Sequence, residues 1–210
     1  QRYKEEIKKE IPEIDLVWGL YDSSLIKELV HVLGIQPVKG TIAQNRKPLI
    51  KNLPYSYIKI AEGCSNFCSY CAIPLIRGRF NAFPPSLIVA DAREALNRYV
   101  KELIIVAQDT AVYQYDDKRI WDILAMISNL EGDFWIRLMY CHPDHIDDRL
   151  IEALVTVPKV VPYIDIPFQH ASKKILQSMN RHGDADTYLK LIEKLRDAIP
   201  DIAIRSTFMV

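Results

Sequence analysis

The sequence predicts an α/β protein whose larger part is an incomplete TIM-like barrel of parallel strands. From residue 55 onward, strand-like runs recur every ~30–45 residues with a helical period between them, which is the pattern of βα units that build a parallel sheet. Five such units are too many for a small open sheet alone and too few for a closed eight-stranded barrel. In either architecture, chemistry belongs at the carboxyl ends of the strands.

The barrel elements follow from local patterns. The expected strands are Tyr57–Ala61, Glu102–Ala107, Phe134–Tyr140, Val161–Pro167 and Ile202–Val210. Ser86, Asp147-Asp148 and Ser172 are expected to cap three of the helices. The apolar residues that share one face of each helix are Ile88, Ala92, Ala95, Leu96 and Tyr99, then Leu150, Ile151 and Leu154, then Ile175, Leu176 and Met179, and finally Leu191, Ile192, Leu195 and Ile199.

The first quarter of the chain does not continue the βα pattern of the barrel. Residues 1–36 contain an amphipathic helix, a strand-like run over Ile14–Gly19 and a second helix over Ser23–Leu33, which we interpret as the remnant of an N-terminal α/β domain. Residues 37–54 are punctuated by proline and glycine and have little apolar period, as a linker does. The barrel domain is therefore expected at 55–210. Because the chain begins with Gln1 and ends inside a predicted strand, we interpret it as a piece of a longer protein.

Charge and hydropathy exclude several classes of protein. Lys plus Arg and Asp plus Glu both number 27, so no global basic field attracts nucleic acid, and 49% hydrophobic residues exclude a disordered chain. The apolar runs, of which Leu103–Ala107 is typical, fall far short of the ~18 residues that a membrane span needs. There is no signal-peptide pattern. We expect a cytoplasmic protein without membrane contact.

Three of the four cysteines are grouped just after the first barrel strand. Cys64, Cys68 and Cys71 are spaced by three and then two residues, and three clustered thiols cannot all pair among themselves. A structural zinc site usually needs a fourth ligand in a second knuckle, and Cys141 and the five histidines are isolated in the sequence. A 4Fe-4S cluster bound by three cysteines leaves one iron open. From spacing alone, an iron–sulfur cluster, a zinc site and unrelated structural cysteines all stay open, and the first is favoured.

The cysteine motif resembles the signature of radical S-adenosylmethionine (SAM) enzymes. The match is Cys64-x-x-x-Cys68-x-x-Cys71, with the aromatic Tyr70 directly before the last cysteine. The resemblance implies that these three cysteines hold a 4Fe-4S cluster whose open iron chelates SAM. It further implies one-electron cleavage of SAM to a 5′-deoxyadenosyl radical, and a partial (βα)6 barrel.

Further motifs resemble the methylthiotransferase branch of that superfamily, through Glu62-Gly63-Cys64 and Ile73-Pro74-x-x-Arg77-Gly78. The RimO type within this branch is resembled by Gln108-Asp109-Thr110-x-x-Tyr113, Pro162-Tyr163-x-Asp165-Ile166-Pro167-Phe168-Gln169-His170-Ala171-Ser172 and Arg205-Ser206-Thr207-Phe208. This resemblance implies addition of a methylthio group to the β-carbon of an aspartate in small-subunit ribosomal protein twelve.

Two alternatives to a methylthiotransferase that acts on a ribosomal protein remain at this point. The first is a tRNA adenosine methylthiotransferase of the MiaB type. That type usually has Gln-Asn-Val and Gln-Ser-Gly where this chain has Gln108-Asp109-Thr110 and Gln169-His170-Ala171. The second alternative is a zinc-binding structural module.

The resemblance also implies cofactors and partners beyond this chain. A second 4Fe-4S cluster is expected on three more cysteines of an N-terminal domain, and this sequence does not contain them. An electron donor such as flavodoxin or ferredoxin is expected to supply the electron. Without the second cluster, we expect no methylthiolation and at most uncoupled cleavage of SAM.

Five residues outside the cysteine triad are candidates for binding SAM. The resemblance places Tyr70 near the adenine, and Gln108 and Asp109 follow strand two, where the methionyl amine is bound. Gln169 follows strand four and Arg205 lies in strand five, at positions suited to contacts with ribose, carboxylate or substrate. Each also has a structural alternative: Tyr70 as a solvent-facing aromatic, Asp109 as a cap, and Gln169 and Arg205 as side chains satisfied by neighbouring carbonyls.

Two further features are expected to be structural. Cys141 ends strand three and is interpreted as a small buried hydrophobe and not as a fourth ligand. Lys173, Lys174, Arg181 and His182 form a basic group that is interpreted as a solvated helix surface.

Overall fold

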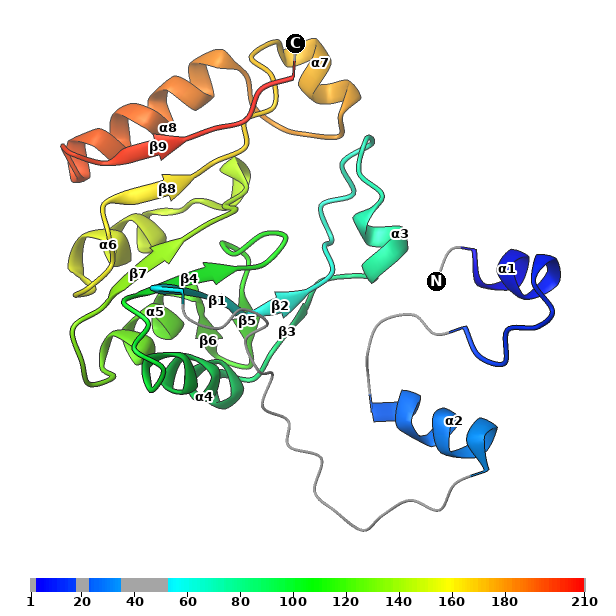
Figure 1. The fold of residues 1–210 in the computed structure, drawn as a ribbon. Coiled ribbons are helices and arrows are strands. Elements are labelled where there is room, and N and C mark those ends of the chain that lie inside the picture. The colour runs from blue at the N-terminus through cyan, green and yellow to red at the C-terminus, as the bar shows by residue number, and fades with distance from the viewer. Residues whose placement is uncertain (1–2, 18–22, 35–52, 210) are drawn as a thin grey trace.

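The computed structural model describes residues 3–17, 23–34 and 53–209. Five strands form the wall of the barrel: β1 (Tyr55–Lys59), β4 (Glu102–Val106), β7 (Trp135–Leu138), β8 (Tyr163–Asp165) and β9 (Ala203–Arg205). The order β1-β4-β7 is a parallel sheet, and β8 pairs in parallel with β9. A bridge from Ile136 to Val160 connects the two groups. The predicted α/β fold with an incomplete parallel barrel is confirmed (Figure 1).

Helices cover the outer side of this curved wall. They are α4 (Pro85–Leu96), α5 (Ile120–Ser128), α6 (Asp148–Thr156) and α8 (Ala185–Ala198), whereas α7 (Lys173–Ser178) lies beyond the carboxyl ends of β8 and β9 (Figure 1). Successive helices pack together, α4 on α5, α5 on α6 and α6 on α8, in the order that a βα barrel requires (Figure 1). This leaves the carboxyl ends of the strands and the connections that follow them as the place for a site.

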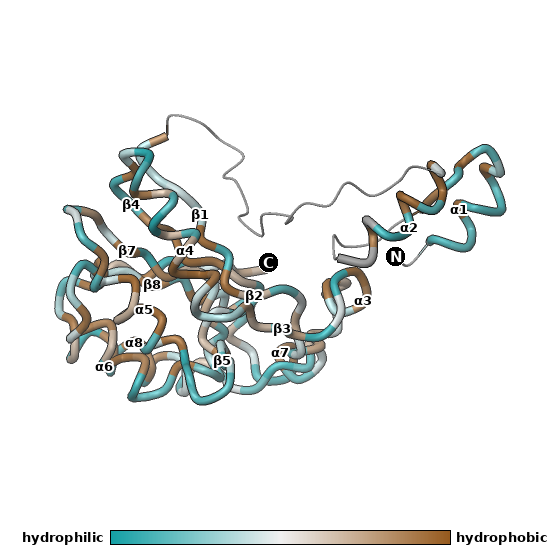
Figure 2. The backbone as a smooth tube through the Cα atoms, turned by 90° about the horizontal axis from the view of Figure 1, so that it is seen from below, coloured by the Kyte–Doolittle hydropathy of each residue, from teal (hydrophilic) through white to brown (hydrophobic). Residues whose placement is uncertain are grey.

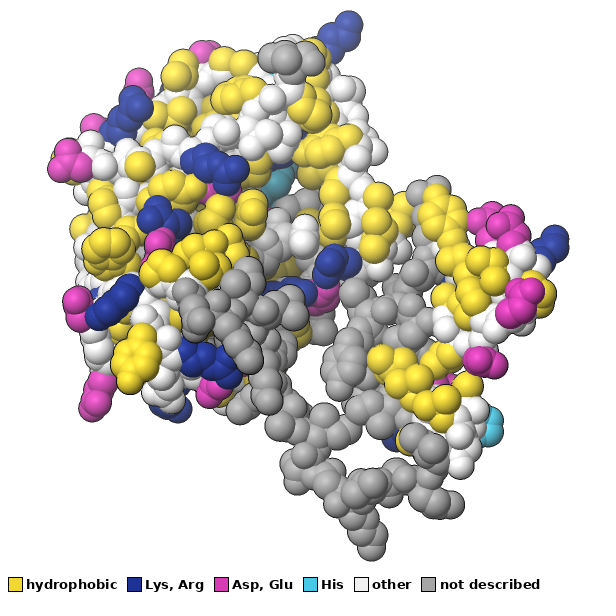
Figure 3. Space-filling view, in the orientation of Figure 1, with side chains coloured by type: hydrophobic (Ala, Val, Ile, Leu, Met, Phe, Trp, Pro, Cys, Tyr) yellow, Lys and Arg dark blue, Asp and Glu magenta, His cyan; other side chains and the backbone are white. Residues whose placement is uncertain are grey.

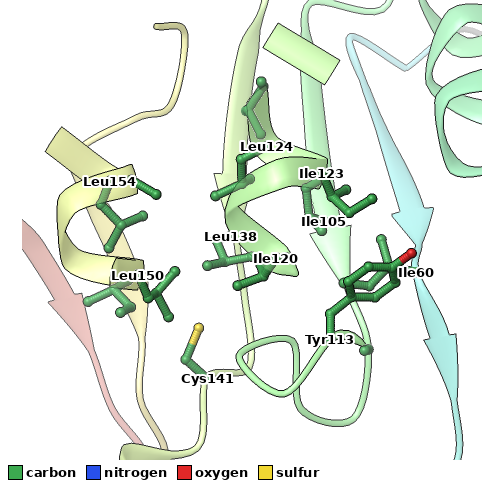
Figure 4. Close-up of a cluster of buried hydrophobic side chains, with 14 of the residues drawn as sticks. Ile60, Ile105, Tyr113, Ile120, Ile123, Leu124, Leu138, Cys141, Leu150 and Leu154 are labelled. Atoms are coloured by element: carbon green, nitrogen blue, oxygen red, sulfur yellow. The ribbon is translucent and has the colours of Figure 1, made fainter. Parts of the chain in front are cut away.

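The core lies between the strands and the helices. Ile58 and Ile105 from the strands and Ile123 from α5 are each at most 2% exposed, and Figure 4 shows how such side chains from neighbouring elements point toward one another. The stripe Ile88, Ala92 and Ala95 is buried, as predicted. Figure 2 shows hydrophobic and hydrophilic residues alternating along the helices, as expected when one face of each helix is buried. Apolar burial on one face of each element therefore stabilises the barrel.

Several predicted element boundaries are wrong. Helix α4 begins after Pro84, so the exposed Ser86 is not its cap, because a proline already provides the dihedral angle that a first helical residue needs. Tyr99 lies beyond the end of α4 at a positive φ of 64° and is 89% exposed. Ser172 does precede α7, but its side chain makes no capping hydrogen bond. The last strand, β9, is only three residues long.

One predicted helix cap is confirmed, and several elements were not predicted. Asp147 is confirmed as the cap of α6, with its carboxylate accepting a hydrogen bond from the backbone N of Leu150 at 2.9 Å. The prediction did not include α5, which begins where Asp122 accepts a hydrogen bond from the backbone N of Arg119. Nor did it include the short elements β2 (Ala61–Glu62), α3 (Ile73–Arg77), β3 (Asn81–Ala82), β5 (Gln114–Tyr115), β6 (Lys118–Arg119) and the 3-10 helix η1 (Pro143–His145).

The N-terminal part contributes no residue to the barrel core. Its two predicted helices are present as α1 (Lys4–Glu10) and α2 (Ser23–Leu33), and both stand apart from the barrel in Figures 1 and 2. The predicted strand over Ile14–Gly19 is wrong for residues 14–17, which form no strand. A turn follows α1 there, and Ile14 N donates a hydrogen bond to Ile11 O. Residues 18–19 lie outside the described residues, as does the predicted linker except for residues 53 and 54.

No helix among the described residues is long and apolar enough to cross a membrane.

Candidate metal and cofactor site

The three grouped cysteines lie in the loop between β2 and α3, beyond the carboxyl end of β1. Cys64, Cys68 and Cys71 are partly buried and have free thiols. Figure 1 shows this loop reaching from the β2 end of the molecule toward α7. A free cysteine can bind a metal as its thiolate.

The base of the cysteine loop is closed by a tight backbone approach at Gly63. Gly63 has φ 71°, and a Cβ placed on it would come within 2.2 Å of the carbonyl oxygen of Arg79 and 2.6 Å of that of Gly78. Beside it, Cys64 N donates to Gly78 O at 3.1 Å. The carboxylate of Glu62, just before Gly63, forms an ion pair with Arg77 from α3. Only glycine fits this positive φ and this close backbone approach, which explains why Gly63 precedes the first cysteine.

The far end of the loop is held by the segment that follows α7. Ser69 N donates to Met179 O at 3.0 Å, and the Ser69 hydroxyl donates to Ser178 O at 2.8 Å. The Asn180 side chain donates to Phe67 O at 3.0 Å. Contacts between residues more than 100 positions apart therefore hold the cysteine loop against the end of α7 and the residues after it.

A buried carboxylate, that of Asp109, joins the cysteine loop to two strand ends. Asp109 follows β4 and is 1% exposed. Its oxygens accept hydrogen bonds from Asn66 Nδ2 at 2.9 Å and from the backbone N of Ala111 and of His142, each at 3.2 Å. His145 Nδ1 lies 2.7 Å from Asp109 Oδ2 and donates to it, because an ionised carboxylate only accepts.

These contacts determine the charges of the network. Burial raises the pKa of Asp109, but the hydrogen bonds from His145 and Asn66 outweigh it, so the pKa lies below its ordinary value. The bond to Asp109 raises the pKa of His145. Burial lowers the pKa of His142 to about 4, so that His142 is neutral near pH 7. The site therefore contains one buried anion and one histidine disposed to carry a proton.

Two of the thiols, those of Cys64 and Cys68, lie in surroundings that favour the protonated form. Burial raises the pKa of Cys64, against the opposing hydrogen bond from Asn66 N. Burial also raises the pKa of Cys68, against the opposing charge of Arg181. Because metal ligation requires the thiolate, metal binding at these residues releases protons.

A cavity of about 580 Å³ opens beside Cys64. Its lining combines apolar and polar side chains from the cysteine loop, from the segment after β4 and from η1. They are Cys64, Ser65, Asn66, Phe80, Asp109, Val112, Gln114, Asp116 and His145. This size is within the ~300–1,000 Å³ of sites for small molecules.

Hydrophobic side chains surround the cysteine loop on the outer surface. Figure 3 shows them gathered over α7 and α3. The exposed ones in these elements and the loop are Phe67, Tyr70, Leu75, Ile76 and Ile175.

The cysteine triad suits an iron–sulfur cluster in its chemistry. Each cysteine of such a cluster binds a different iron, so the sulfurs surround a group larger than one ion. Within the described part of the chain, no three or more His, Cys, Asp or Glu side chains are arranged to hold a single metal ion. The Arg181 guanidinium near Cys68 provides a positive charge for thiolate ligands.

The five candidates for SAM binding have different surroundings. Asp109 lines the cavity with Cys64, and its Ala111 bond also makes it a local cap. The Tyr70 hydroxyl accepts a hydrogen bond from Arg181 Nη1 at 3.1 Å. Gln108 is exposed, Gln169 has a positive φ of 70°, and Arg205 Nη1 donates to Asp165 at 3.4 Å. Tyr70 and these three residues do not line the cavity.

The remaining expectations have mixed outcomes. Cys141 is fully buried in the core, and burial raises its pKa to about 12, which confirms it as a hydrophobe (Figure 4). Arg181 is 3% exposed, so its assignment to a solvated surface is wrong; the chain turns inward after α7 and buries it beside the cysteine loop.

Sequence reasoning missed Asn66, His142 and His145. The two histidines follow β7 at its carboxyl end, and this position was the available signal.

The sequence of residues 58–210 matches the protein family described as the radical SAM superfamily. The chain belongs to this superfamily. Membership implies SAM and a 4Fe-4S cluster as cofactors.

Curated relatives narrow the comparison within the radical SAM superfamily. The chain is 41% identical over 212 residues to the ribosomal protein uS12 methylthiotransferase RimO of Thermodesulfovibrio yellowstonii, covering 100% of this chain and 49% of that protein. It is 39% identical to the RimO of Carboxydothermus hydrogenoformans, covering 100% of this chain and 50% of the relative. The chain thus spans about half the length of these relatives.

Solved structures of radical SAM proteins share the fold. The methyltransferase TsrM from Kitasatospora setae, with cobalamin and a [4Fe-4S] cluster bound, matches with a TM-score of 0.58 at 13% identity, over 72% of this chain and 30% of TsrM. The cobalamin-dependent SAM radical enzyme OxsB matches with a TM-score of 0.58 at 10% identity, over 73% of this chain and 23% of OxsB. At these identities the likeness concerns the fold alone.

Gly63→Ala in this radical SAM chain is expected to destabilise the protein by about 2 kcal/mol or more, because it adds a steric clash to an unfavourable φ. The measurement is the free energy of unfolding in urea. Gly132→Ala is the matched control, since Gly132 also has a positive φ, 113°, but its nearest Cβ contact would be at 3.8 Å. Equal losses in both variants would show that the close approach at Gly63 does not matter.

His145→Gln is expected to lower stability mainly at acidic pH. A histidine with a raised pKa contributes stability below its unfolded pKa of ~6.5 and loses it as the pH rises through the folded value. Asp109 stays ionised at about pH 5.5 because its pKa is lowered. We expect a deficit of about 1 kcal/mol at that pH, smaller at about pH 9, from urea unfolding. A deficit that grows with pH would contradict the ion pair, and the exposed His182→Gln is the control.

Proposed function

We propose that Cys64, Cys68 and Cys71 bind three irons of a 4Fe-4S cluster and leave the fourth iron open for SAM. The observation that carries this proposal is the group of three free thiols in one loop at the carboxyl end of β1, beside a cavity of about 580 Å³. Bound there, the cluster supplies the electron that cleaves SAM. The loop contacts at Gly63 and Ser69 keep the three thiols together.

The cavity is proposed as the place of SAM, and its polar lining as the means of orienting it. Because the Asp109 carboxylate already accepts four hydrogen bonds, we propose that it positions Asn66 and His145 and does not itself bind the methionyl amine. His145 can then hold a proton at the cavity wall. Contacts from Tyr70, Gln108, Gln169 and Arg205 to SAM or substrate remain predictions of the family resemblance.

For the whole protein, we propose transfer of a methylthio group to the β-carbon of an aspartate in ribosomal protein uS12. Identities of 39–41% to proteins named for this activity support it over modification of tRNA. A ribosomal substrate is consistent with a cytoplasmic location. The electron would come from a small donor such as flavodoxin or ferredoxin.

We also propose that methylthio transfer requires a second 4Fe-4S cluster held by other cysteines. Apart from the triad, the sequence contains only Cys141, which is buried in the core. The residues of this chain would then suffice to bind and cleave SAM, while the sulfur is supplied elsewhere.

Anaerobic reconstitution with iron and sulfide tests the ligands. The wild-type chain and Cys141→Ala are expected to take up about four irons per chain, and Cys64→Ala substantially less, because it lacks one of three ligands. Iron analysis and visible absorbance are the measurements. A full cluster in Cys64→Ala would contradict the assignment, and one zinc per chain without SAM binding would point to a structural module.

The reconstituted chain, given SAM and a strong reductant, is expected to form 5′-deoxyadenosine but no methylthiolated uS12, because this chain lacks cysteines for a second cluster. Mass spectrometry detects both products. Methylthiolated uS12 from this chain alone would contradict the need for the second cluster. With a polypeptide of the full length of the relatives, a modified uS12 aspartate supports the substrate, and a modified tRNA adenosine overturns it.

A further inference from the structure

Arg181 is a buried cation with an incomplete set of hydrogen bonds. It follows α7 and is 3% exposed. Its Nη1 donates to the Tyr70 hydroxyl at 3.1 Å. Its Nε and Nη2 are also buried and have no hydrogen-bond partner among the residues that the structure describes. A guanidinium removed from water in this way is costly unless an anion faces it.

Of the three proposed cluster ligands, Cys68 is the one whose charge interacts with that of Arg181. Tyr70, His142 and Tyr188 are the other titratable groups that the charge of Arg181 reaches. Tyr70 is two residues from Cys68 and bonded to Arg181, so it connects the cation to the cysteine loop. The positive charge therefore lies where a thiolate would need it.

Arg181 is held in this place by the backbone around it. Arg181 N donates to Leu176 O at 2.9 Å, and the preceding Asn180 donates from its side chain to Phe67 O of the cysteine loop at 3.0 Å. Ser69 N donates in the opposite direction, to Met179 O. Each of the two segments thus donates a hydrogen bond to the other. These bonds hold Arg181 in a fixed position relative to the cysteine loop.

We propose that Arg181 is a positioning residue of the cluster site that places a buried positive charge beside Cys68 and thereby raises the reduction potential of the cluster. The inference rests on the ligation proposed above. One electron from the external donor makes the cluster more negative, so a nearby cation stabilises the reduced state. Arg181 would thus ease the entry of the electron.

The test compares midpoint potentials of the reconstituted protein without SAM, by redox titration followed by electron paramagnetic resonance. Arg181→Gln is expected to shift the potential to more negative values, and Arg181→Lys to return most of the shift because it keeps the charge. Arg196→Gln on the exposed side of α8 is the control and is expected to leave the potential unchanged. Iron content and thermal midpoint are measured for every variant.

The outcomes separate this inference from the ligand assignment. Failure of the wild-type chain to bind about four irons overturns the ligation and the inference with it. A cluster-loaded Arg181→Gln with the wild-type potential overturns the role of Arg181 alone, even if SAM binds more weakly. If Arg181→Gln loses iron, recovery of the wild-type iron content in Arg181→Lys supports the counter-charge. Failure of Arg181→Lys to recover it assigns Arg181 to packing and overturns the proposal.

Discussion

The arrangement of the site depends on the buried carboxylate of Asp109. It is the point where the cysteine loop, the end of β4 and the segment after β7 meet, through Asn66, Ala111 and His145. A carboxylate without water must be fully hydrogen-bonded, so its burial forces these three segments into one geometry. The loop that carries the thiols is thereby attached to the rigid strands and not left to its own flexibility.

The second attachment comes from the segment around the end of α7. Residues after α7 bind the backbone of the cysteine loop at Ser69 and Phe67, and Arg181 is buried next to Tyr70. The buried anion Asp109 is bonded to Asn66 near the start of the cysteine loop, and the buried cation Arg181 is bonded to Tyr70 near its end. This polarity is an electrostatic environment that a barrel can provide, because its strand ends converge from distant parts of the chain.

The predictions succeeded where the structure of a segment is determined by residues close to one another in the sequence. The cysteine spacing and the stripe Ile88, Ala92 and Ala95 could be read directly, because ligand spacing and helical periodicity are short-range. The errors fall on residues whose state depends on distant partners. Tyr99 continues the helical period yet lies beyond the helix, and Arg181 has the appearance of a surface residue yet is buried.

The sequence by itself determined the α/β class, the five parallel strands and the three-cysteine motif that marks a radical SAM protein. Only the tertiary structure decided which polar residues accompany the thiols. Asn66, Asp109 and His145 come from separate βα units, and burial makes their hydrogen bonds obligatory only once the barrel has formed. Local pattern specifies the elements, whereas the desolvation of polar groups at the strand ends specifies the site.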